Sequence, residues 1–228
     1  MRKTTIETRA LSVDIAPEVL EAASRLIDSS RRRILGLVGA PGSGKSTLSA
    51  ALLAALGERV QVVPMDGYHL SNRQLERLGR AQRKGAPDTF DAWGYRHLLS
   101  RIRDSHGSEE VVYAPGFYRE IEEPIAASIA VDPLIPLVIT EGNYLLLNDA
   151  PWPQVRECLD EVWYLDVDRE VREQRLVARH MQFGRSEREA REWVANTDAP
   201  NAERIEATAG TADRLLWWSD HRIDFKTS

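Results

Sequence analysis

Short runs of apolar residues alternate along the chain with longer stretches in which apolar and polar residues mix. The short runs are rich in β-branched and aliphatic side chains, which is typical of strands buried on both faces of a sheet. This pattern predicts six strands, at residues 34–38, 60–65, 109–114, 133–140, 161–167 and 214–218. We expect a loop with aromatic and charged side chains at 115–120 and a polar turn at 196–201.

The longer stretches carry apolar residues at the spacing of amphipathic helices. Residues 16–29 place Val19 and Leu26 on one face, and Pro17 suits a first helical turn. Further helices are predicted directly after residue 45, within residues 88–105 with Asp88 or Asp91 as the N-cap, and over 168–185 and 187–194. Strands that alternate with helices indicate an α/β fold. We therefore expect one domain, residues 1–228, with a mainly parallel central sheet flanked by helices.

The first predicted strand leads directly into the sequence GAPGSGKS at residues 39–46, which an Ala/Leu-rich helical pattern follows. This is the phosphate-binding P-loop motif in its strand–loop–helix setting, and it predicts the three-layer P-loop NTPase fold. The glycines allow the backbone to wrap an anion, the helix N-terminus faces that anion, Lys45 adds a positive charge, and the Ser46 hydroxyl is placed to bind Mg²⁺. The predicted nucleotide-binding residues are Gly39, Ala40, Pro41, Gly42, Ser43, Gly44, Lys45, Ser46 and Thr47.

Two carboxylates follow predicted strands. Asp66 comes after the strand at 60–65, and Glu141 comes after the strand at 133–140. Ligands of open α/β sheets gather at the carboxyl ends of strands, so both side chains are expected near the phosphate loop. Glu141 is the candidate Walker B residue, because Mg²⁺ prefers hard oxygen ligands. The alternatives are an ordinary Asp-Gly turn at Asp66 and a surface glutamate at position 141.

Composition narrows the class of partner. The chain has 228 residues, a formal net charge of −5 and one cysteine, Cys158. These values argue against a nucleic-acid groove, a disulfide framework and a cysteine-based zinc site. No apolar run approaches the length of a membrane span. We expect a small-molecule partner, no nucleic acid, no membrane, and a cytoplasmic location.

A basic helix is predicted after the strand at 161–167. Arg172, Arg175 and Arg179 recur there at helical spacing. Arginine suits bidentate contact with phosphate, so this helix is a candidate for binding the phosphates of a nucleotide. A solvated basic face is the alternative interpretation.

The ordered motifs together resemble one group of proteins. GAPGSGKS, MDGYH, TFD, VYAPGFY, VITEGNYLLL and LDVDREVREQRLVARH occur in this order between about residues 33 and 201. The set resembles the phosphoribulokinase, uridine kinase and pantothenate kinase group of P-loop small-molecule kinases. The resemblance implies ATP and Mg²⁺ as cofactors and a small helical lid at about residues 168–200.

The same resemblance implies roles for individual residues. Lys45 and Ser46 would bind the phosphates and Mg²⁺, Asp66 would act as the base toward the acceptor hydroxyl, and Glu141 would lie at the metal. Arg175 and Arg179 would act from the lid. Asp91 matches the aspartate that contacts the acceptor ribose in uridine kinases, and Tyr113 matches a pocket tyrosine. The chain departs from uridine kinases at Ala92-Trp93, where a His-Pro pair is expected, and in the loop after Tyr113, which lacks an expected histidine.

The acceptor pocket is expected to combine carboxylates, aromatic rings and one guanidinium. Its predicted substrate-binding residues are Tyr68, His69, Asp91, Tyr113, Tyr118 and Arg119. Such a lining favours a hydroxyl-rich acceptor, such as a nucleoside or a sugar. Arg119 favours an acid such as pantothenate or glycerate as the alternative. The motifs alone leave open a P-loop ATPase or a nucleotide-binding regulatory module without transfer activity, and a homodimer is also open.

Overall fold

The computed structural model describes residues 13–28, 30–219 and 222–226. The strands are β1 (Asp14–Ile15), β2 (Arg33–Val38), β3 (Val60–Val62), β4 (Val112–Tyr118), β5 (Glu123–Val131), β6 (Leu137–Gly142), β7 (Glu161–Asp166), β8 (Arg214–Ser219) and β9 (Arg222–Phe225). The α-helices are α1 (Pro17–Ile27), α2 (Lys45–Leu56), α3 (Asn72–Arg77), α4 (Ala92–Asp104), α5 (Trp152–Arg156), α6 (Arg169–Gln182), α7 (Glu187–Trp193) and α8 (Ala199–Glu206). Within the described residues, no helix is long and apolar enough to span a membrane.

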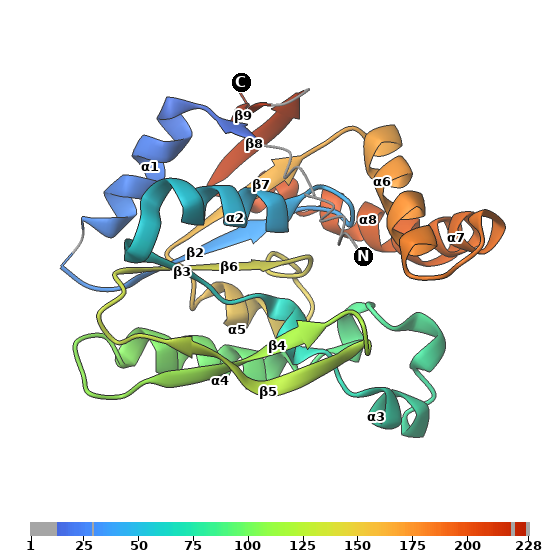
Figure 1. The fold of residues 1–228 in the computed structure, drawn as a ribbon, viewed down its shortest axis with the longest axis horizontal. Helices are drawn as coiled ribbons and strands as arrows, with labels where there is room; N and C mark the ends of the chain where they lie inside the picture. Colours follow the sequence, from blue (N-terminus) through green and yellow to red (C-terminus); the bar gives the residue numbers. More distant parts are fainter. Residues whose placement is uncertain (1–12, 29, 220–221, 227–228) are drawn as a thin grey trace, which may run out of the picture.

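Within this described part of the chain, a seven-stranded sheet has the order β1-β9-β8-β7-β2-β6-β3 (Figure 1). Neighbouring strands run parallel throughout the sheet except for the antiparallel pair β8 and β9. The central strand β2 pairs with β6 in a register that sets Leu37 opposite Glu141 and Val38 opposite Gly142. This register brings Glu141 to the carboxyl end of β2, where the phosphate loop begins.

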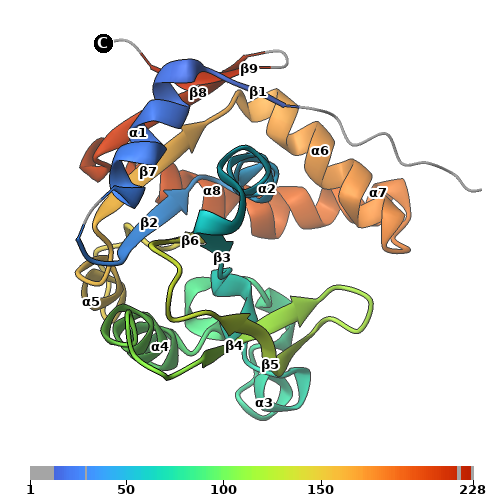
Figure 2. The same ribbon diagram turned by 60° about the vertical axis from the view of Figure 1, so that its left-hand side comes forward.

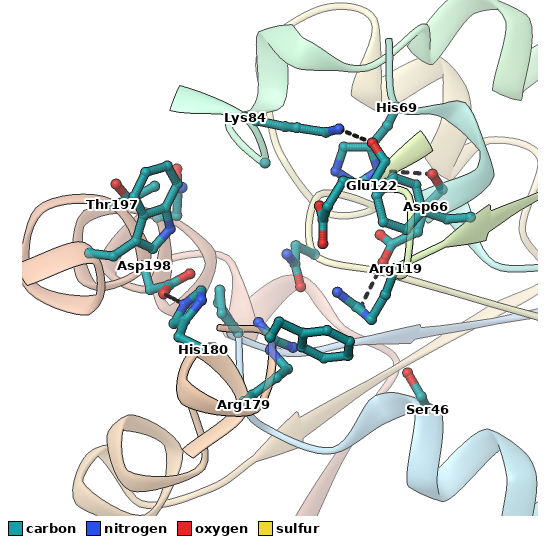
Figure 3. Close-up of a pocket in the computed structure, with 18 of the residues that line it drawn as sticks. Ser46, Asp66, His69, Lys84, Arg119, Glu122, Arg179, His180, Thr197 and Asp198 are labelled. Carbon is teal, nitrogen blue, oxygen red and sulfur yellow. Dashed lines mark hydrogen bonds and ion pairs between the residues drawn. The ribbon is translucent and has the colours of Figure 1, made fainter. Parts of the chain in front are cut away.

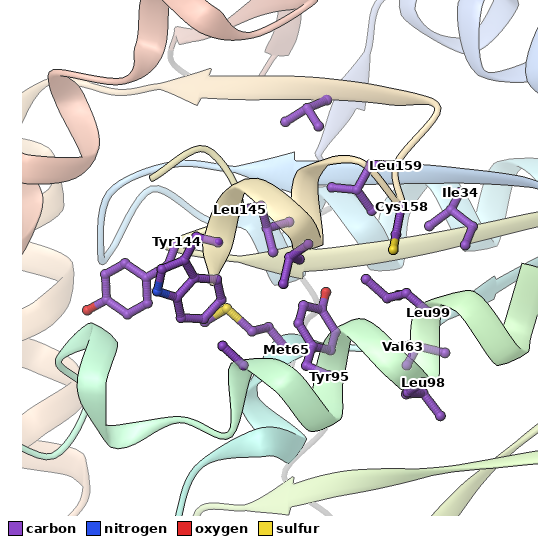
Figure 4. Close-up of a cluster of buried hydrophobic side chains, with 14 of the residues drawn as sticks. Ile34, Val63, Met65, Tyr95, Leu98, Leu99, Tyr144, Leu145, Cys158 and Leu159 are labelled. Atoms are coloured by element: carbon purple, nitrogen blue, oxygen red, sulfur yellow. The ribbon is translucent and has the colours of Figure 1, made fainter. Parts of the chain in front are cut away.

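Helices cover both faces of the sheet (Figure 2). Side chains of β2 alternate between the faces: Leu35 and Leu37 pack with α1 and α2, whereas Ile34 and Val38 pack on the side of α4 and α5. Figure 4 shows the second of these cores, in which Tyr95 of α4 lies among aliphatic side chains. The two buried clusters make three layers, so the predicted mainly parallel α/β fold is confirmed.

The prediction of a loop at residues 115–120 is wrong. β4 continues to Tyr118 and pairs with β5 in an antiparallel hairpin. Residues 115–118, predicted as a loop, therefore belong to the strand. The hairpin is a two-stranded sheet of its own, separate from the central sheet. Its buried residues Val112, Ala114 and Val131 pack on the α4 side, whereas the small and partly exposed residues of β5 do not alternate between buried and exposed positions.

The prediction of a polar turn at residues 196–201 is also wrong. Residues Val194–Asp198 form a π-helical turn that continues directly from α7 into α8. Pro200 lies in the first turn of α8, directly after the π-helical turn. Residues 168–200, predicted as a lid, therefore contain α6, α7 and the start of α8. Their movement as a lid remains a prediction.

A buried arginine joins the layers at the end of the sheet opposite the phosphate loop. The Arg32 side chain is fully buried, and it donates hydrogen bonds to the backbone oxygens of Ile102 (2.7 Å), Asp132 (2.6 Å) and Ile135 (2.8 Å) and to Ser105 Oγ (3.1 Å). These partners lie at the end of α4 and between β5 and β6. Arg32 thus ties α4 and the base of the hairpin to the start of β2.

Candidate active site

The phosphate loop lies between β2 and α2. Gly42 and Gly44 have φ values of +79° and +91°, in the left-handed region that favours glycine, and Gly44 is the N-cap of α2. A Cβ atom on Gly44 would lie 2.2 Å from Cζ3 of Trp218, and one on Gly42 would lie 2.7 Å from the carbonyl oxygen of Arg172. The loop therefore holds a conformation that side chains at these two positions would prevent, with the α2 N-terminus at its end.

Lys45, Ser46 and Glu141 meet at the start of α2. Ser46 Oγ donates a hydrogen bond to Glu141 Oε2 at 2.9 Å, and Lys45 Nζ donates to the carbonyl oxygen of Gly39 at 2.8 Å. Burial lowers the pKa of Lys45 to about 8, and the carboxylates of Glu141 and Asp66 oppose this shift. Burial raises the pKa of Glu141, which Lys45 and Ser46 oppose. The arrangement places a partly buried cation and a partly buried carboxylate beside the loop.

A cavity of about 560 Å³ opens beside the phosphate loop (Figure 3). Pro41, Gly42, Lys45, Ser46 and Glu141 form its floor. One wall carries Asp66, His69, Lys84, Phe90, Phe117, Arg119 and Glu122. The opposite wall carries Arg179, His180, Arg185, Trp193, Thr197, Asp198 and Asn201. The cavity has the size of a small-molecule site, with polar groups that converge from several elements.

Asp66 follows β3 in a short 3₁₀ turn and faces the cavity. Its carboxylate lies 3.4 Å from Nη2 of Arg119, which comes from the hairpin turn between β4 and β5. The ring of His69 packs on Phe90 and Phe117, with centroids 4.0 and 4.7 Å away, and burial lowers the pKa of His69. The imidazole is therefore held in its neutral form more strongly than a solvated histidine.

The opposite wall contains residues that the sequence interpretation did not assign to the site. His180 Nε2 and Asp198 Oδ2 are 2.9 Å apart, which links α6 to the π-helical turn. The guanidinium of Arg185 lies over the ring of Trp193, 3.7 Å from its centroid. The sequence of the π-helical turn resembles a polar turn and has no helical periodicity, so it does not predict that Asp198 faces the cavity. π-helical turns within helices frequently occur at functional sites.

Arg175 and Arg179 occupy different places although both belong to α6. Arg179 lines the cavity, and burial lowers its pKa. Arg175 lies over the ring of Trp218, 4.4 Å from its centroid, and its Nη1 is 3.4 Å from the carbonyl oxygens of Gly42 and Ser43. Arg175 thus contacts the outer side of the phosphate loop, and it is absent from the cavity lining.

Four of the predicted substrate-binding residues lie outside the cavity lining. Asp91 is the N-cap of α4, where its carboxylate accepts a hydrogen bond of 2.8 Å from the Gly94 N–H. Tyr68 packs on Tyr95, and burial raises the pKa of Tyr68 to about 12. Tyr113 and Tyr118 of β4 are exposed on the surface of the hairpin. His69 and Arg119 are the two that the cavity brings together with Asp66.

Comparison with known proteins identifies the family. No protein-family model matches the chain. A protein of Schizosaccharomyces pombe, which its name assigns provisionally as a uridine kinase, is 35% identical over 225 residues, covering 92% of this chain and 94% of that protein. The chain belongs to the uridine kinase-like family of P-loop kinases. The family resemblance that the ordered motifs indicated is thereby confirmed.

Solved structures agree with this membership in the P-loop kinase family. A crystal structure of a Silicibacter sp. TM1040 protein, described provisionally as a fructose transport system kinase, is 38% identical with a TM-score of 0.79. The match covers 89% of this chain and 98% of that one. The Saccharomyces cerevisiae P-loop protein YFH7 has the same fold, with a TM-score of 0.72 at 21% identity, over 90% of this chain and 98% of that one.

The residues of this P-loop kinase-family chain fit a nucleotide and a magnesium ion. The left-handed glycines Gly42 and Gly44 let the loop turn into α2, whose N-terminal N–H groups and Lys45 can face an anion. Ser46 and Glu141 supply two oxygens on the cavity floor, a donor set that suits a hard cation which keeps water and phosphate ligands. Among the described residues, no group of three or more histidine, cysteine or acidic side chains forms a further metal site.

Proposed function

We propose that the chain is an ATP-dependent kinase that phosphorylates a hydroxyl of a small, hydroxyl-rich metabolite. One observation carries this proposal: the phosphate loop and the Asp66 carboxylate border the same cavity. Hydrolysis and transfer both need a group that orients the nucleophile, but a transfer enzyme also needs space for an acceptor beside that group, and the cavity provides this space next to Asp66. The names of the family relatives, which are kinases, support the same reaction class.

The roles on the cavity floor follow from charge. Lys45 and the N–H groups at the start of α2 would hold the phosphates of the nucleotide. Ser46 and Glu141 would hold Mg²⁺, which would supply further positive charge at the phosphates when bound. Arg179 would add a guanidinium from α6. The positive charges of the floor and of this arginine together would stabilise the negative charge on a phosphoryl group during transfer.

Asp66 would orient and deprotonate the acceptor. Its carboxylate accepts the proton of the acceptor hydroxyl while the hydroxyl oxygen forms a bond to the γ-phosphorus. The bond from that phosphorus to the β–γ bridging oxygen breaks in the same process, and its electron pair leaves with ADP. Nη2 of Arg119 lies 3.4 Å from this carboxylate. The protein contributes mainly positioning and charge to this transfer.

The acceptor side of the cavity supports a hydroxyl-rich molecule. His69, Phe90 and Phe117 provide an aromatic surface, and Asn143 and Asp66 also line the cavity. Amide groups and carboxylates pair well with hydroxyls, and a ligand that left them unpaired would be rejected. The names of the two relatives refer to uridine and to a fructose transport system, and both uridine and fructose carry several hydroxyls.

Arg175 and Trp218 support a place for the nucleotide base. Their stack lies against Gly44, on the outer side of the phosphate loop and away from Asp66. A guanidinium and an indole ring offer flat surfaces on which a purine can stack. The base would then project from the loop on the side opposite the acceptor, so that the γ-phosphate points into the cavity.

The test is acceptor-dependent release of ADP from ATP. The panel contains nucleosides, hexoses, pentoses, pantothenate and glycerate, and each product is identified by mass spectrometry. We expect one hydroxyl-rich compound to stimulate ADP release strongly and to gain one phosphoryl group. ATP hydrolysis that no acceptor stimulates would favour the ATPase alternative, and a phosphorylated acid as the sole product would replace the hydroxyl-rich acceptor by an anionic one.

A further inference from the structure

The turn of the β4–β5 hairpin carries an arginine into the cavity from the acceptor wall. Nη2 of Arg119 is 3.4 Å from Oδ2 of Asp66, and both side chains are partly exposed, at 41% and 34%. An ion pair of this length and exposure is weak. Arg119 therefore keeps most of its hydrogen-bond donors for a ligand in the cavity (Figure 3).

A second arginine faces the same space from the opposite wall. Arg179 of α6 lines the cavity; burial and then the positive charge of Arg119 lower its pKa, and the carboxylates of Asp198, Asp66 and Glu122 oppose this shift. Across residues 13–28, 30–219 and 222–226, the guanidinium of Arg179 makes no hydrogen bond or ion pair. Two guanidiniums that repel each other across a shared space are stabilised by an anion between them.

The contact between Arg119 and Asp66 indicates which anion this is. Any anion bound by Arg119 lies beside the Asp66 carboxylate, so the anion that the reaction itself brings next to Asp66 is the one expected there. The transferred phosphoryl group must lie there, because the hydroxyl that Asp66 deprotonates attacks its phosphorus. Negative charge on that group spreads over three equatorial oxygens, which can meet donors from two sides.

We propose that Arg119 and Arg179 bind the transferred phosphoryl group from opposite walls of the cavity, so that the hairpin turn supplies one arm of a two-sided arginine clamp. This inference rests on the proposed kinase function. It adds Arg119 to the residues that contact the reacting atoms. It also removes the reason to expect an anionic acceptor, because Arg119 is engaged by the phosphoryl group.

The hairpin turn is held in place by residues outside it. Lys84 Nζ donates hydrogen bonds to the backbone oxygen of Glu122 and, at 2.6 Å, to Asn72 Oδ1. The Asn72 N–H donates to Glu123 Oε1 at 2.9 Å. Glu122 has a φ of +51°, a strained value for a residue with a side chain, and such strain persists only where the surroundings hold it. Lys84 and Asn72 are therefore positioning residues for Arg119.

The clamp is tested by binding, without knowledge of the acceptor. The affinities of ADP with Mg²⁺, and of ADP with Mg²⁺ and aluminium fluoride as a mimic of the transferring phosphoryl group, are measured by calorimetry. We expect Arg119→Ala and Arg179→Ala each to weaken binding of the mimic by about 10- to 100-fold, with the affinity for ADP alone unchanged. Arg73→Ala, an exposed neighbour of Asn72, is the matched control and should change neither affinity.

The outcomes separate the clamp from the kinase function. Wild-type protein that binds the mimic, together with an Arg119→Ala variant that binds it equally well, overturns the clamp and leaves the kinase function standing. Wild-type protein that binds ADP but gains no affinity from aluminium fluoride overturns both. Circular dichroism confirms that each variant is folded, and Arg119→Lys, which keeps the charge but loses the planar fork, should recover part of the affinity.

The positioning role is tested in the same assay. Lys84→Met should weaken binding of the mimic by about 3- to 10-fold in the wild-type background. In the Arg119→Ala background it should cause no further loss, because its effect passes through Arg119. Additive losses in the double variant would show that Lys84 contacts the ligand itself, and would overturn the positioning role.

Discussion

Replacing Gly44 with alanine tests how the phosphate loop is restrained. Gly44 has a φ of +91°, and its added Cβ would lie 2.2 Å from Cζ3 of Trp218 and 3.1 Å from two further ring atoms. The left-handed backbone costs an L-residue about 1–2 kcal/mol. Displacing a packed ring costs about 1–3 kcal/mol more. We therefore expect Gly44→Ala to lower the free energy of unfolding by about 2–5 kcal/mol.

A double-mutant cycle separates these two costs. Trp218→Ala removes the ring that would clash, so Gly44→Ala should cost only about 1–2 kcal/mol in that background. Gly184 provides a matched control, because its φ is +97° and no atom lies within 4 Å of the position of its Cβ. Gly184→Ala should therefore show the backbone cost without the steric cost.

The stabilities are measured by urea denaturation followed by far-ultraviolet circular dichroism. The denaturant slope is compared among variants, since a change in slope would report a change in the unfolded or native state and not only in stability. If Gly44→Ala costs the same in the presence and absence of the Trp218 ring, the ring does not restrain the loop. A Gly44→Ala protein as stable as the wild type would refute both parts of the reasoning.

Three further predictions concern the roles at the cavity. Lys45→Ala should abolish acceptor-dependent ADP release and change the midpoint of urea denaturation only slightly. Unchanged turnover would refute the phosphate-loop assignment. Asp66→Asn should reduce kcat by about 100-fold or more with nucleotide affinity retained in calorimetry, as for a positioned base; simultaneous loss of ATP binding would assign Asp66 to the metal or to the structure. Arg175→Ala should raise the KM for ATP, whereas Arg179→Ala should lower kcat with little change in that KM; identical kinetic changes in the two variants would contradict their separate placement.

The parts of the site that could be predicted from the sequence are those built by local chain geometry. The GAPGSGKS segment requires left-handed glycines and a following helix, and the structure contains both. Glu141 is predicted to follow its strand, and in the structure it is the second-last residue of β6. The rule that ligands gather at carboxyl ends of parallel strands was enough to bring Glu141 to Ser46.

The walls of the cavity could not be predicted, because they depend on contacts between distant segments. β5 alternates poorly between buried and exposed residues, since much of the hairpin faces outward, so its pairing with β4 left no periodic pattern. Asp198 reaches the cavity through a π-helical turn, whose irregular spacing resembles that of a loop. From the sequence, Asp91 could be either a helix N-cap or a ligand contact, because aspartate suits both roles; in the structure it is the N-cap of α4.

The Arg32 anchor has a mechanical consequence for the cavity. It fixes α4 and the base of the hairpin to the start of β2, the end of this strand that lies away from the phosphate loop. A body held at one end moves little near the attachment and most at its free end. A rotation of the acceptor layer about Arg32 would therefore displace the hairpin turn, and Arg119 with it, more than the base of the hairpin, and would change the width of the cavity.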